Sequence, residues 1–569
     1  MKIRKYIIQG TVALMGLGIT SCVGDLDLQP NDPNIVEGSG ENFNENSLAM
    51  CYAGIATSGY QGAGSSYINI DGLDAGTSAY LRLLFTLSEF CADEMIWIWP
   101  NDEGIGDIIA ATWSDNNVII NGAYYRLMAH IGICNQFLTN VKNDNSPEMT
   151  ELKAEARVLR AYSYYNMLDL FGMSSFITED AEPGALPEQI SSEDLFAWIE
   201  SELLDIVDNK LISSSPIYGR VGLDGAEGLL ARLYLNAETF TGKARWEDCQ
   251  KRCEAIIARH QGGGFQGSGL AEHYLYLFAR NNSEYMPGGG NSAENEILFG
   301  IAFNDELVQS YGGPTFIISG TISNTHYCPR QIYGSSSEWS CIRGRYQMAE
   351  RFYGISDQDV RDDLWLRGVM PAGSDASGSW DEENYSDMFE DFSGDWKTTG
   401  GNAIIKFTGR TPNAAKDGGW DMYKNDEGNW VCGFPATSFA STDQPIIRLA
   451  DIYLMYTECY INGRVGESGK ALDYMNLVRA RANSPLATAG DLNIQTLMND
   501  RSREFYLESL RRTDLIRNKM FADAQQTVWQ YKGSINNNAG TRISERNNRY
   551  PIPYTVRSAQ PDFKQNPGY

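Results

Sequence analysis

The sequence predicts a mainly α-helical protein in which tetratricopeptide-like helix pairs form the scaffold. Long irregular loops and a few short strands are expected to form a ligand-binding face. Two observations predict this fold. Long segments carry apolar residues at spacings of three and four, and several come in pairs rich in small residues. Between them lie Gly-, Ser-, Asn- and Asp-rich stretches at 59–79, 261–295, 304–345 and 371–436, and loops of such length usually carry function.

The first long helix is predicted within residues 146–172. Ser146 can cap its start, Pro147 suits its first turn and Gly172 can end it. Between these signals an apolar or small stripe recurs at helical spacing, formed by Leu152, Ala156, Leu159, Ser163, Met167 and Leu170.

Further helices follow the same pattern. A second helix is predicted in 191–210, a helical hairpin in 222–261, two helices joined by a short glycine-containing loop in 443–483, and one last helix in 495–520. In the hairpin, Ala226, Ala231 and Ala237 would let a partner helix approach closely. No strict period of about 34 residues survives, so the helix pairs are predicted to be divergent.

The stretch FCADEMIWIWPND, residues 90–102, places two tryptophans two positions apart before a turn. In an extended segment Trp97 and Trp99 share one face while Ile96 and Ile98 point to the other. We therefore expect the isoleucines to face the core and the tryptophans to face solvent as a paired aromatic platform. The alternative is a pair of core tryptophans whose indole N–H groups are satisfied.

Charge excludes some partners. The 569 residues contain 46 basic and 73 acidic side chains, a formal net charge of −27, and no long Lys/Arg cluster interrupts this balance. Nucleic acid and anionic lipid headgroups are therefore poor candidate partners.

The N-terminus predicts export. A basic start, an apolar run and small residues lead to Cys22, which is typical of a lipoprotein signal peptide over residues 1–21 followed by a mature domain over 22–569. Cys22 is the expected lipidation site; an ordinary signal peptide with an incidental cysteine is the alternative. Lipidation would anchor the protein without a membrane-spanning segment, because no later stretch approaches the ~20 apolar residues of a membrane helix. The acidic residues directly after Cys22 resemble a signal for display on the outer surface.

The remaining nine cysteines indicate neither a disulfide framework nor a zinc site, because their number is odd and no C-x-x-C pair occurs. Cys249 and Cys253 lie one helical turn apart. They could form a metal or redox pair, but two buried small side chains on a helix is the favoured interpretation.

No enzyme motif stands out. The four histidines belong to no H-E-x-x-H pattern, and neither G-x-S-x-G nor G-x-x-x-x-G-K-[ST] occurs in the sequence. Paired carboxylates could hydrolyse a glycosidic bond, but 73 acidic residues make any single pair uninformative. We expect no catalytic residue, no cofactor and no metal.

Carbohydrate binding fits the residue types better. A pyranose offers an apolar C–H face and a rim of hydroxyls, so its site needs flat aromatic walls and a few fixed donors and acceptors. Trp97 and Trp99 could supply the wall, and Asp74, Arg82 and Asn101 the hydrogen bonds.

The sequence also resembles the SusD/RagB family of outer-membrane nutrient-binding lipoproteins. The resemblance rests on EARVLRAYSYYNMLDLFG and LLARLYLNAETFTG in the first half. In the second half it rests on PIIRLADIYLMYTECYING, ALDYMNLVRARAN, REFYLESLRRTDLIRNKMF and the closing YPIPYTVRSAQPDFKQNPGY. It extends over essentially the whole mature chain.

The resemblance to a starch-binding member implies a curved aromatic cradle for a helical α-1,4-glucan such as starch or malto-oligosaccharides. Its residues here would be Asp74, Arg82, Trp97, Trp99, Asn101, Tyr311 and Trp339. The resemblance further implies a non-catalytic protein, lipid-anchored at Cys22 to the outer membrane and exposed at the cell surface, with a TonB-dependent transporter as partner. Differences at Pro100, Asp102, 321–338 and 371–436 could reshape the rim. Another glucan, a fructan, a host glycan or a peptide thus remains an alternative ligand, and glycoside hydrolysis a less favoured activity.

Overall fold

The structure is a computed structural model that describes residues 43–59, 62–64, 70, 72–99, 102–142, 144–182, 184–282, 293–322, 333–352, 359–361, 365–369, 402–413, 419–424, 426, 430–433, 435–522, 528–529, 531–534 and 539–569. The predicted signal peptide 1–21, Cys22 and Asn101 lie outside these residues. The chain divides into two compact units, Met1–Ser47 and Leu48–Tyr569, and the elements from α3 onward belong to the second unit.

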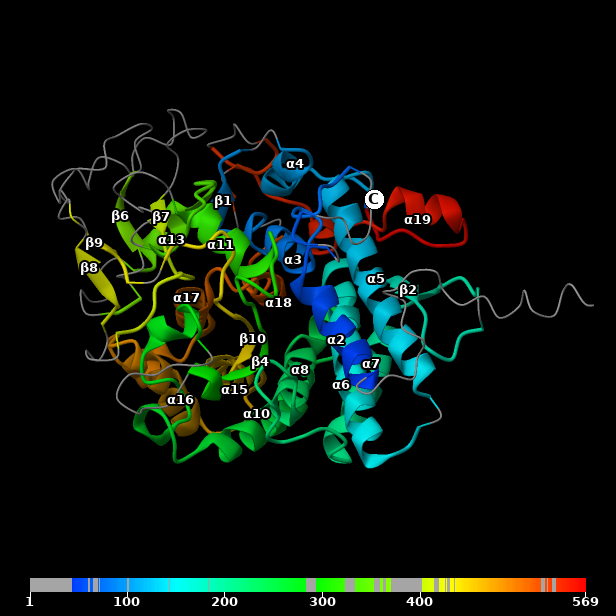
Figure 1. The fold of residues 1–569 in the computed structure, drawn as a ribbon, viewed down its shortest axis with the longest axis horizontal. Helices are drawn as coiled ribbons and strands as arrows, with labels where there is room; N and C mark the ends of the chain where they lie inside the picture. The colour runs from blue at the N-terminus through cyan, green and yellow to red at the C-terminus, as the bar shows by residue number, and fades with distance from the viewer. Residues whose placement is uncertain are drawn as a thin grey trace, which may run out of the picture. The chain divides into compact units, whose positions relative to one another are not determined.

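Packed helices form the scaffold of this second unit. Neighbours in the sequence pack on one another from α5 to α8, and α10 connects α8 to α15, which packs on α16 (Figure 1). The helices are α5 (Val118–Asn140), α6 (Pro147–Phe171), α7 (Ser192–Asp208), α8 (Leu223–Leu235), α9 (Ala237–Thr241), α10 (Trp246–His260), α15 (Leu449–Gly463) and α16 (Ser468–Arg481). The predicted helix-pair architecture is confirmed.

The ends of α6 follow the sequence signals. The Ser146 hydroxyl accepts a hydrogen bond from the Met149 backbone N–H at 3.2 Å, and Pro147 occupies the first turn. Gly172 follows the last residue with a φ of 70°, a conformation that favours glycine. Helix α7 starts in the same way, because the Ser191 hydroxyl accepts from the Asp194 backbone N–H. Local signals therefore suffice to define both helices.

Small residues allow α8 to pack closely on its neighbours. Ala226, Ala231 and Ala237 are fully buried, as predicted. A Cβ added at Gly228 would lie 3.0 Å from the Ile447 side chain, and one at Gly225 would lie 2.9 Å from the Leu298 carbonyl oxygen. The tight approach of β4 and β10 to this helix depends on these positions.

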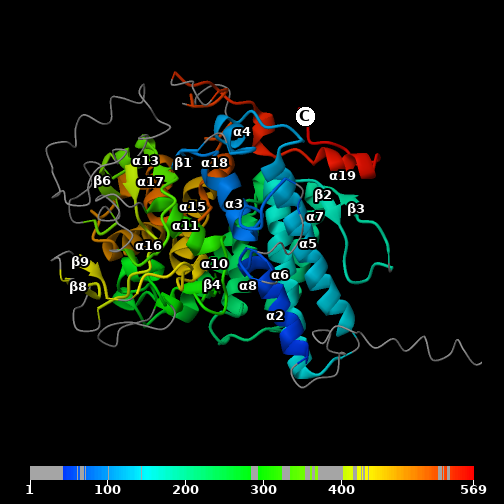
Figure 2. The ribbon, with the colours of Figure 1, turned by 45° about the horizontal axis from the view of Figure 1, so that its top comes forward.

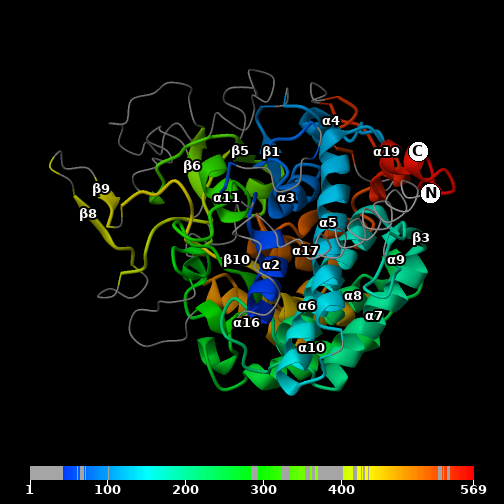
Figure 3. The ribbon, with the colours of Figure 1, turned by 45° about the vertical axis from the view of Figure 1, so that its right-hand side comes forward.

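The strands are short. A four-stranded antiparallel sheet has the order β1-β5-β7-β6, with β1 (Met95–Trp97), β5 (Ile342–Gly344), β7 (Asn402–Ile404) and β6 (Trp365–Val369). The other pairs are β4 (Ile297–Ile301) with β10 (Gln444–Arg448), β2 (Ser174–Phe176) with β3 (Glu188–Ile190), and β8 (Met422–Lys424) with β9 (Trp430–Cys432). In Figures 2 and 3, β1 lies beside α3 (Tyr80–Glu89) and α11 (Gly313–Thr321).

Smaller elements complete the description of the secondary structure. The remaining α-helices are α2 (Phe43–Ala56), α4 (Ile105–Ala110), α13 (Tyr346–Glu350), α17 (Ile494–Phe505), α18 (Arg511–Arg517) and α19 (Tyr554–Ala559). Short 3-10 turns occur at Phe265–Gly267, Tyr274–Phe278, Ala293–Asn295, Ala489–Asp491 and Glu545–Asn548. None of the helices in the described ranges combines the length and apolar character needed to span a bilayer.

Two helix predictions need correction. The segment 443–463 starts as strand β10, and its helix begins only at Leu449. The predicted continuous helix over 495–520 is broken between α17 and α18, where Leu507 and Ser509 adopt φ values of 62° and 64°. Non-glycine residues rarely adopt such values unless tertiary contacts hold them there.

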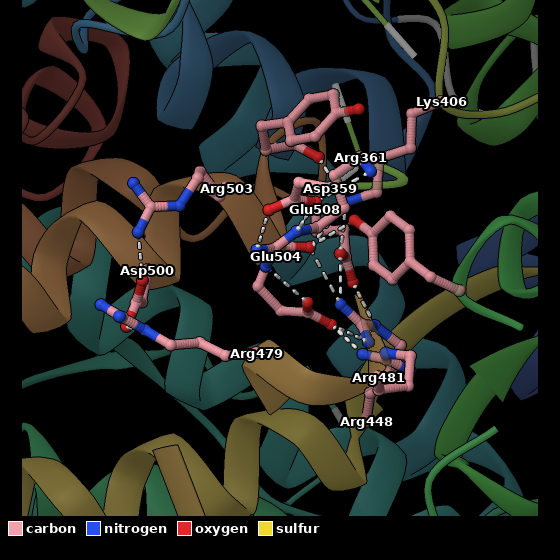
Figure 4. Close-up of polar contacts among 12 residues, drawn as sticks. Asp359, Arg361, Lys406, Arg448, Arg479, Arg481, Asp500, Arg503, Glu504 and Glu508 are labelled. Carbon is pink, nitrogen blue, oxygen red and sulfur yellow. Dashed lines mark hydrogen bonds and ion pairs between the residues drawn. The ribbon is translucent and has the colours of Figure 1, made fainter. Parts of the chain in front are cut away.

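The contacts at this break form a buried ion cluster, defined by Glu296, Asp359, Arg361, Lys406, Arg448, Arg481, Glu504 and Glu508. The Glu504 carboxylate accepts hydrogen bonds from Arg448 and Arg481 and pairs with Arg361 (Figure 4). Lys406 donates to the backbone carbonyls of Glu504 at 3.0 Å and Tyr506 at 2.7 Å. The turn is therefore held by charged groups that the helical pattern does not reveal.

The cysteines agree with the favoured interpretation. Cys249 and Cys253 on α10 are fully buried, and all eight cysteines in the described ranges are free thiols. In the part of the chain that the structure describes, no three His, Cys, Asp or Glu side chains converge in a way that could hold a metal ion.

Candidate functional site

A cavity of about 440 Å³ opens where α3, β1 and α11 meet. We call it the aromatic cavity. Segments far apart in the sequence form its walls: Gly72, Leu73, Asp74, Thr77, Arg82, Thr86, Phe90, Trp97, Trp99, Asp102, Glu103, Ile105, Ile119, Phe316 and Trp339. Five of the seven predicted binding residues thus line one cavity.

Trp97 forms the floor of this cavity. The segment is extended, as predicted, but Trp97 is only 3% exposed. Its ring stacks on Phe316 with centroids 5.7 Å apart and planes 20° from parallel, and its indole N–H donates to Asp102 Oδ2 at 2.9 Å. The prediction that Trp97 faces solvent is therefore wrong. Trp97 is buried by tertiary contacts: Phe316 of α11 and Phe90 cover the strand face that the alternation of side chains predicted to be exposed.

Trp99 is the exposed member of the pair, with 43% of its surface accessible. Its ring stands at 85° to that of Trp97, with centroids 5.5 Å apart. The two indoles do line the same cavity, but they meet as a corner rather than as one flat platform. A flat ligand can contact the face of Trp99 while its edge approaches Trp97.

Tyr311 and Trp339 extend the aromatic surface. Trp339 is half-buried, with its ring centroid 6.2 Å from that of Phe316, and it precedes β5. Tyr311 is 36% exposed, and its ring lies 6.3 Å from Trp339 and 5.1 Å from Phe439. Tyr311 therefore adjoins the cavity through Trp339 and continues its aromatic wall.

Arg82 lies at the centre of these rings. Its guanidinium carbon is 4.5 Å from the centroid of Phe316 and 5.8 Å from those of Trp97 and Trp339. Among the residues that the structure describes, none forms a hydrogen bond or ion pair with this guanidinium. Burial lowers the pKa of Arg82, and the nearby Asp74 carboxylate opposes that effect. The side chain thus presents fixed N–H donors that no acceptor among the described residues uses.

Asp74 is held beside Arg82 by the turn that precedes α3. The Thr77 backbone N–H donates to Asp74 Oδ1 at 3.0 Å, and the Thr77 hydroxyl donates to Oδ2 at 2.6 Å. Partial burial raises the pKa of Asp74, but the Thr77 hydrogen bonds and Arg82 outweigh it and hold the pKa below its usual value. Asp74 is therefore an ionised acceptor at neutral pH.

Gly76 lets these groups come together. A Cβ at this position would lie 2.9 Å from Tyr311 Cβ, 3.2 Å from Asp74 Oδ1 and 3.5 Å from Arg82 Nη1. The first distance is shorter than real Cβ contacts, so a side chain here would displace Tyr311.

Sequence reasoning missed Phe316 and Thr77. Phe316 stacks on Trp97 and lies closest to Arg82, yet an apolar ring in the segment SYGGPTF looks like any core phenylalanine. Thr77 orients Asp74, and its spacing of three residues within a turn-rich segment is the signal that could have identified it. The chemistry of the cavity comprises aromatic faces, one cation and three carboxylates, Asp74, Asp102 and Glu103. This set suits a neutral, hydroxyl-rich ligand and disfavours an anion.

Comparison with known proteins is consistent with this geometry. The chain is 29% identical to the starch-binding protein SusD of Bacteroides thetaiotaomicron, over 99% of both chains. The fold is similar to that of a SusD superfamily protein from Bacteroides vulgatus, with a TM-score of 0.64, 17% identity and coverage of 94% of this chain and 100% of the other. It is similar as well to surface glycan-binding protein A from Bacteroides thetaiotaomicron in complex with laminarihexaose, with a TM-score of 0.64, 16% identity and coverage of 93% and 100%.

The sequence profile of the SusD family matches residues 319–569, which include Trp339, the α15–α16 pair and the turn between α17 and α18. Together with the full-length relative and the shared fold, this match makes the chain similar to the SusD family along its whole length.

Proposed function

We propose that the protein binds a starch-type α-glucan in the aromatic cavity without converting it chemically. The observation that carries this proposal is Arg82, a guanidinium surrounded by Phe316, Trp97 and Trp339 whose donors are not used by described residues. A sugar places its C–H face on such rings and its hydroxyls at the rim. Asp74 would accept from a hydroxyl while Arg82 donates to its neighbour.

The similarity to a starch-binding relative over 99% of the chain supports the choice of an α-glucan. Each aromatic contact is worth about 0.5 to 1.5 kcal/mol, so a few contacts with hydrogen bonds predict affinities from roughly micromolar to millimolar.

Isothermal titration of the purified, unlipidated protein tests the ligand. We expect binding of a linear malto-oligosaccharide and equal or tighter binding of a cyclic one of similar length, because the ring is already curved. A laminari-oligosaccharide is the comparison ligand, since a protein of similar fold forms a complex with laminarihexaose. Tighter binding of the laminari-oligosaccharide would mean that the ligand of this cavity is a β-glucan and not an α-glucan. If none of these oligosaccharides gives a measurable heat of binding with protein that is shown to be folded, glycan binding in this cavity is refuted.

We further propose that lipidation of Cys22 anchors the protein at the cell surface in the outer membrane, and that it delivers glycan to a TonB-dependent transporter. The signal-like residues 1–21 and the similarity to the SusD family support this placement. Replacing Cys22 by Ser should release the protein from the membrane fraction and stop incorporation of labelled fatty acid. Unchanged membrane association would contradict the anchor. Release of reducing sugar from starch by wild-type protein would contradict the non-catalytic role.

A further inference from the structure

A second cavity, of about 240 Å³, lies at the opposite end of the β1–β5 pair from the aromatic cavity. In this pair Met95 lies opposite Gly344 and Trp97 opposite Ile342. Trp97 and Trp339 therefore mark one end, while Asp93, which precedes β1, and Arg345, which follows β5, mark the other. We call the second cavity the arginine cavity.

The arginine cavity is cationic, although the chain as a whole carries a net charge of −27. Arg345, Arg351 and Arg511 line it, against the single carboxylate of Asp93. Arg511 donates to both oxygens of Asp93, at 2.7 and 2.9 Å, and Arg351 donates to Oδ2 as well. Glu94 lies buried behind Arg351 and Arg511 and does not line the cavity. Positive charge remains in excess even when Glu94 is counted.

Arg345 has fewer hydrogen-bond partners than Arg351 and Arg511, and its guanidinium carbon lies 5.5 Å from the centroid of the Tyr531 ring. It is only 5% exposed, and its Nε donates to the Met95 carbonyl oxygen at 2.9 Å. Neither terminal nitrogen forms a hydrogen bond within the described residues, and Nη2 is buried without a partner. Burial lowers the pKa of Arg345 to about 10, so the group is still charged at neutral pH. A buried cation with unused donors is destabilising unless an acceptor arrives.

Apolar side chains also line this cavity. Leu515, Met520 and Trp529 line it, and the Trp529 indole N–H already donates to the Phe521 carbonyl oxygen at 2.7 Å. Trp529 therefore offers an apolar surface with no unused donor. A ligand that fits both kinds of lining has an anionic group next to a compact body with apolar faces.

We propose that the arginine cavity binds a carboxylate, carried by an acidic sugar or a small organic acid. A guanidinium N–H donates a charge-assisted hydrogen bond to a carboxylate oxygen. Because Nη2 of Arg345 is buried, Nη1 is the donor that a ligand in the cavity can reach, and Arg351 and Arg511, fixed by Asp93, add positive charge around it. This site goes beyond the proposed glucan site, which is lined by three carboxylates and one cation.

Titration of the full mature protein with sodium glucuronate tests the proposal. Glucose and sodium sulfate, at equal ionic strength, are the comparison ligands. We expect glucuronate to bind and to raise the melting temperature, and glucose and sulfate to do neither. Titrations with sodium acetate and sodium succinate distinguish the source of the carboxylate. Tighter binding of glucuronate than of either acid would identify the ligand as an acidic sugar, and equal binding of all three would identify it as a small organic acid. No binding of any carboxylate, or an equal response to sulfate, would overturn the proposal.

Variants of Arg345 show whether the binding is at this site. Arg345→Met should weaken glucuronate binding by roughly tenfold or more and leave the protein folded, because of its donors only Nε, which bonds the Met95 carbonyl, is used by a described residue. Arg345→Lys retains the charge but lacks the guanidinium, so its binding should be weaker than that of the wild type. Unchanged glucuronate affinity in both variants would refute the assignment.

Matched variants separate this proposal from the glucan site. Arg82→Met should retain glucuronate binding, and Arg345→Met should retain malto-oligosaccharide binding, since the two side chains line different cavities. Loss of glucuronate binding in Arg82→Met would place the carboxylate in the aromatic cavity and overturn the proposal. Failure of malto-oligosaccharide binding in the wild type would refute only the glucan site.

Discussion

Two arginines of this protein lie against aromatic rings in opposite circumstances. Arg448, in the buried ion cluster, is 1% exposed and contacts Phe278 and Phe505, and its donors are taken by Glu296, Glu504 and Glu508. Arg82, in the aromatic cavity, contacts Phe316 but pairs with no residue in the described ranges. The same side chain thus completes the fold in one region and remains available to a ligand in the other. Hydrogen-bond partners, more than burial, separate the two roles.

The largest effect should come from breaking the ion cluster. Glu504→Gln leaves Arg448, Arg481 and Arg361 buried without their shared carboxylate, so the free energy of unfolding should fall by about 3 to 5 kcal/mol. Chemical denaturation measures this change. The control is Asp180→Asn, which removes an exposed pair with Lys142 and should leave stability nearly unchanged. Equal effects of the two variants would contradict the contrast between buried and exposed charge.

Trp97→Ala should behave as a core substitution as well as a binding substitution. The side chain is buried against Phe316 and Phe90, so its removal should lower the free energy of unfolding by about 3 to 5 kcal/mol. Denaturation and titration with a malto-oligosaccharide should both report a loss. A variant of wild-type stability would show that Trp97 belongs to the exposed wall.

Arg82→Met should affect binding and spare the fold, the reverse of Glu504→Gln. We expect the affinity for a malto-oligosaccharide to fall by about tenfold or more, with stability unchanged within about 0.5 kcal/mol. Lys243→Met removes an exposed cation elsewhere and is the control for the change in net charge. If Arg82→Met instead unfolds the protein, Arg82 has a structural role like that of Arg448.

Trp99→Ala should show a smaller effect of the same kind. Its side chain is 43% exposed, so we expect a loss of about 0.5 to 1.5 kcal/mol in binding free energy and little change in stability. Titration calorimetry measures the first quantity and thermal denaturation the second. Tyr423→Ala, an exposed aromatic on β8 outside the cavity, is the control and should bind like the wild type.

The smallest expected effect is that of pH on glucan binding. Thr77 and Arg82 hold the pKa of Asp74 below its ordinary value despite partial burial, so Asp74 loses its charge only as pH falls through that lowered value. Affinity should therefore be constant between about pH 5 and 8 and decline only in more acidic solution, because the ordinary aspartate pKa is about 3.9. A decline already near pH 6 would show that another group controls binding.

The site was partly predictable. Residue type identified Asp74, Arg82 and Trp99 as groups suited to a sugar, the family resemblance implied Trp339, and the structure brings all four to one cavity. Strand alternation placed Trp97 and Trp99 on one face, but it carries no information on what covers that face. Phe316, more than two hundred residues away in the chain, buries Trp97 and contributes a wall of the site. Asn101 lies outside the described residues, and its role remains a prediction.

By itself, the sequence determined the features that depend on neighbouring residues. Caps and apolar periodicity defined α6 and α7, and small residues marked the close packing of α8, because helix formation and helix packing are encoded over a few turns. Only the tertiary structure decided the features that depend on distant groups: the break between α17 and α18, the burial of Trp97 and the two cavities at the ends of the β1–β5 pair. In each case the contacting residue comes from a segment that is distant in the sequence. Charge pairing and aromatic stacking act between such segments and produce no periodic pattern in the sequence.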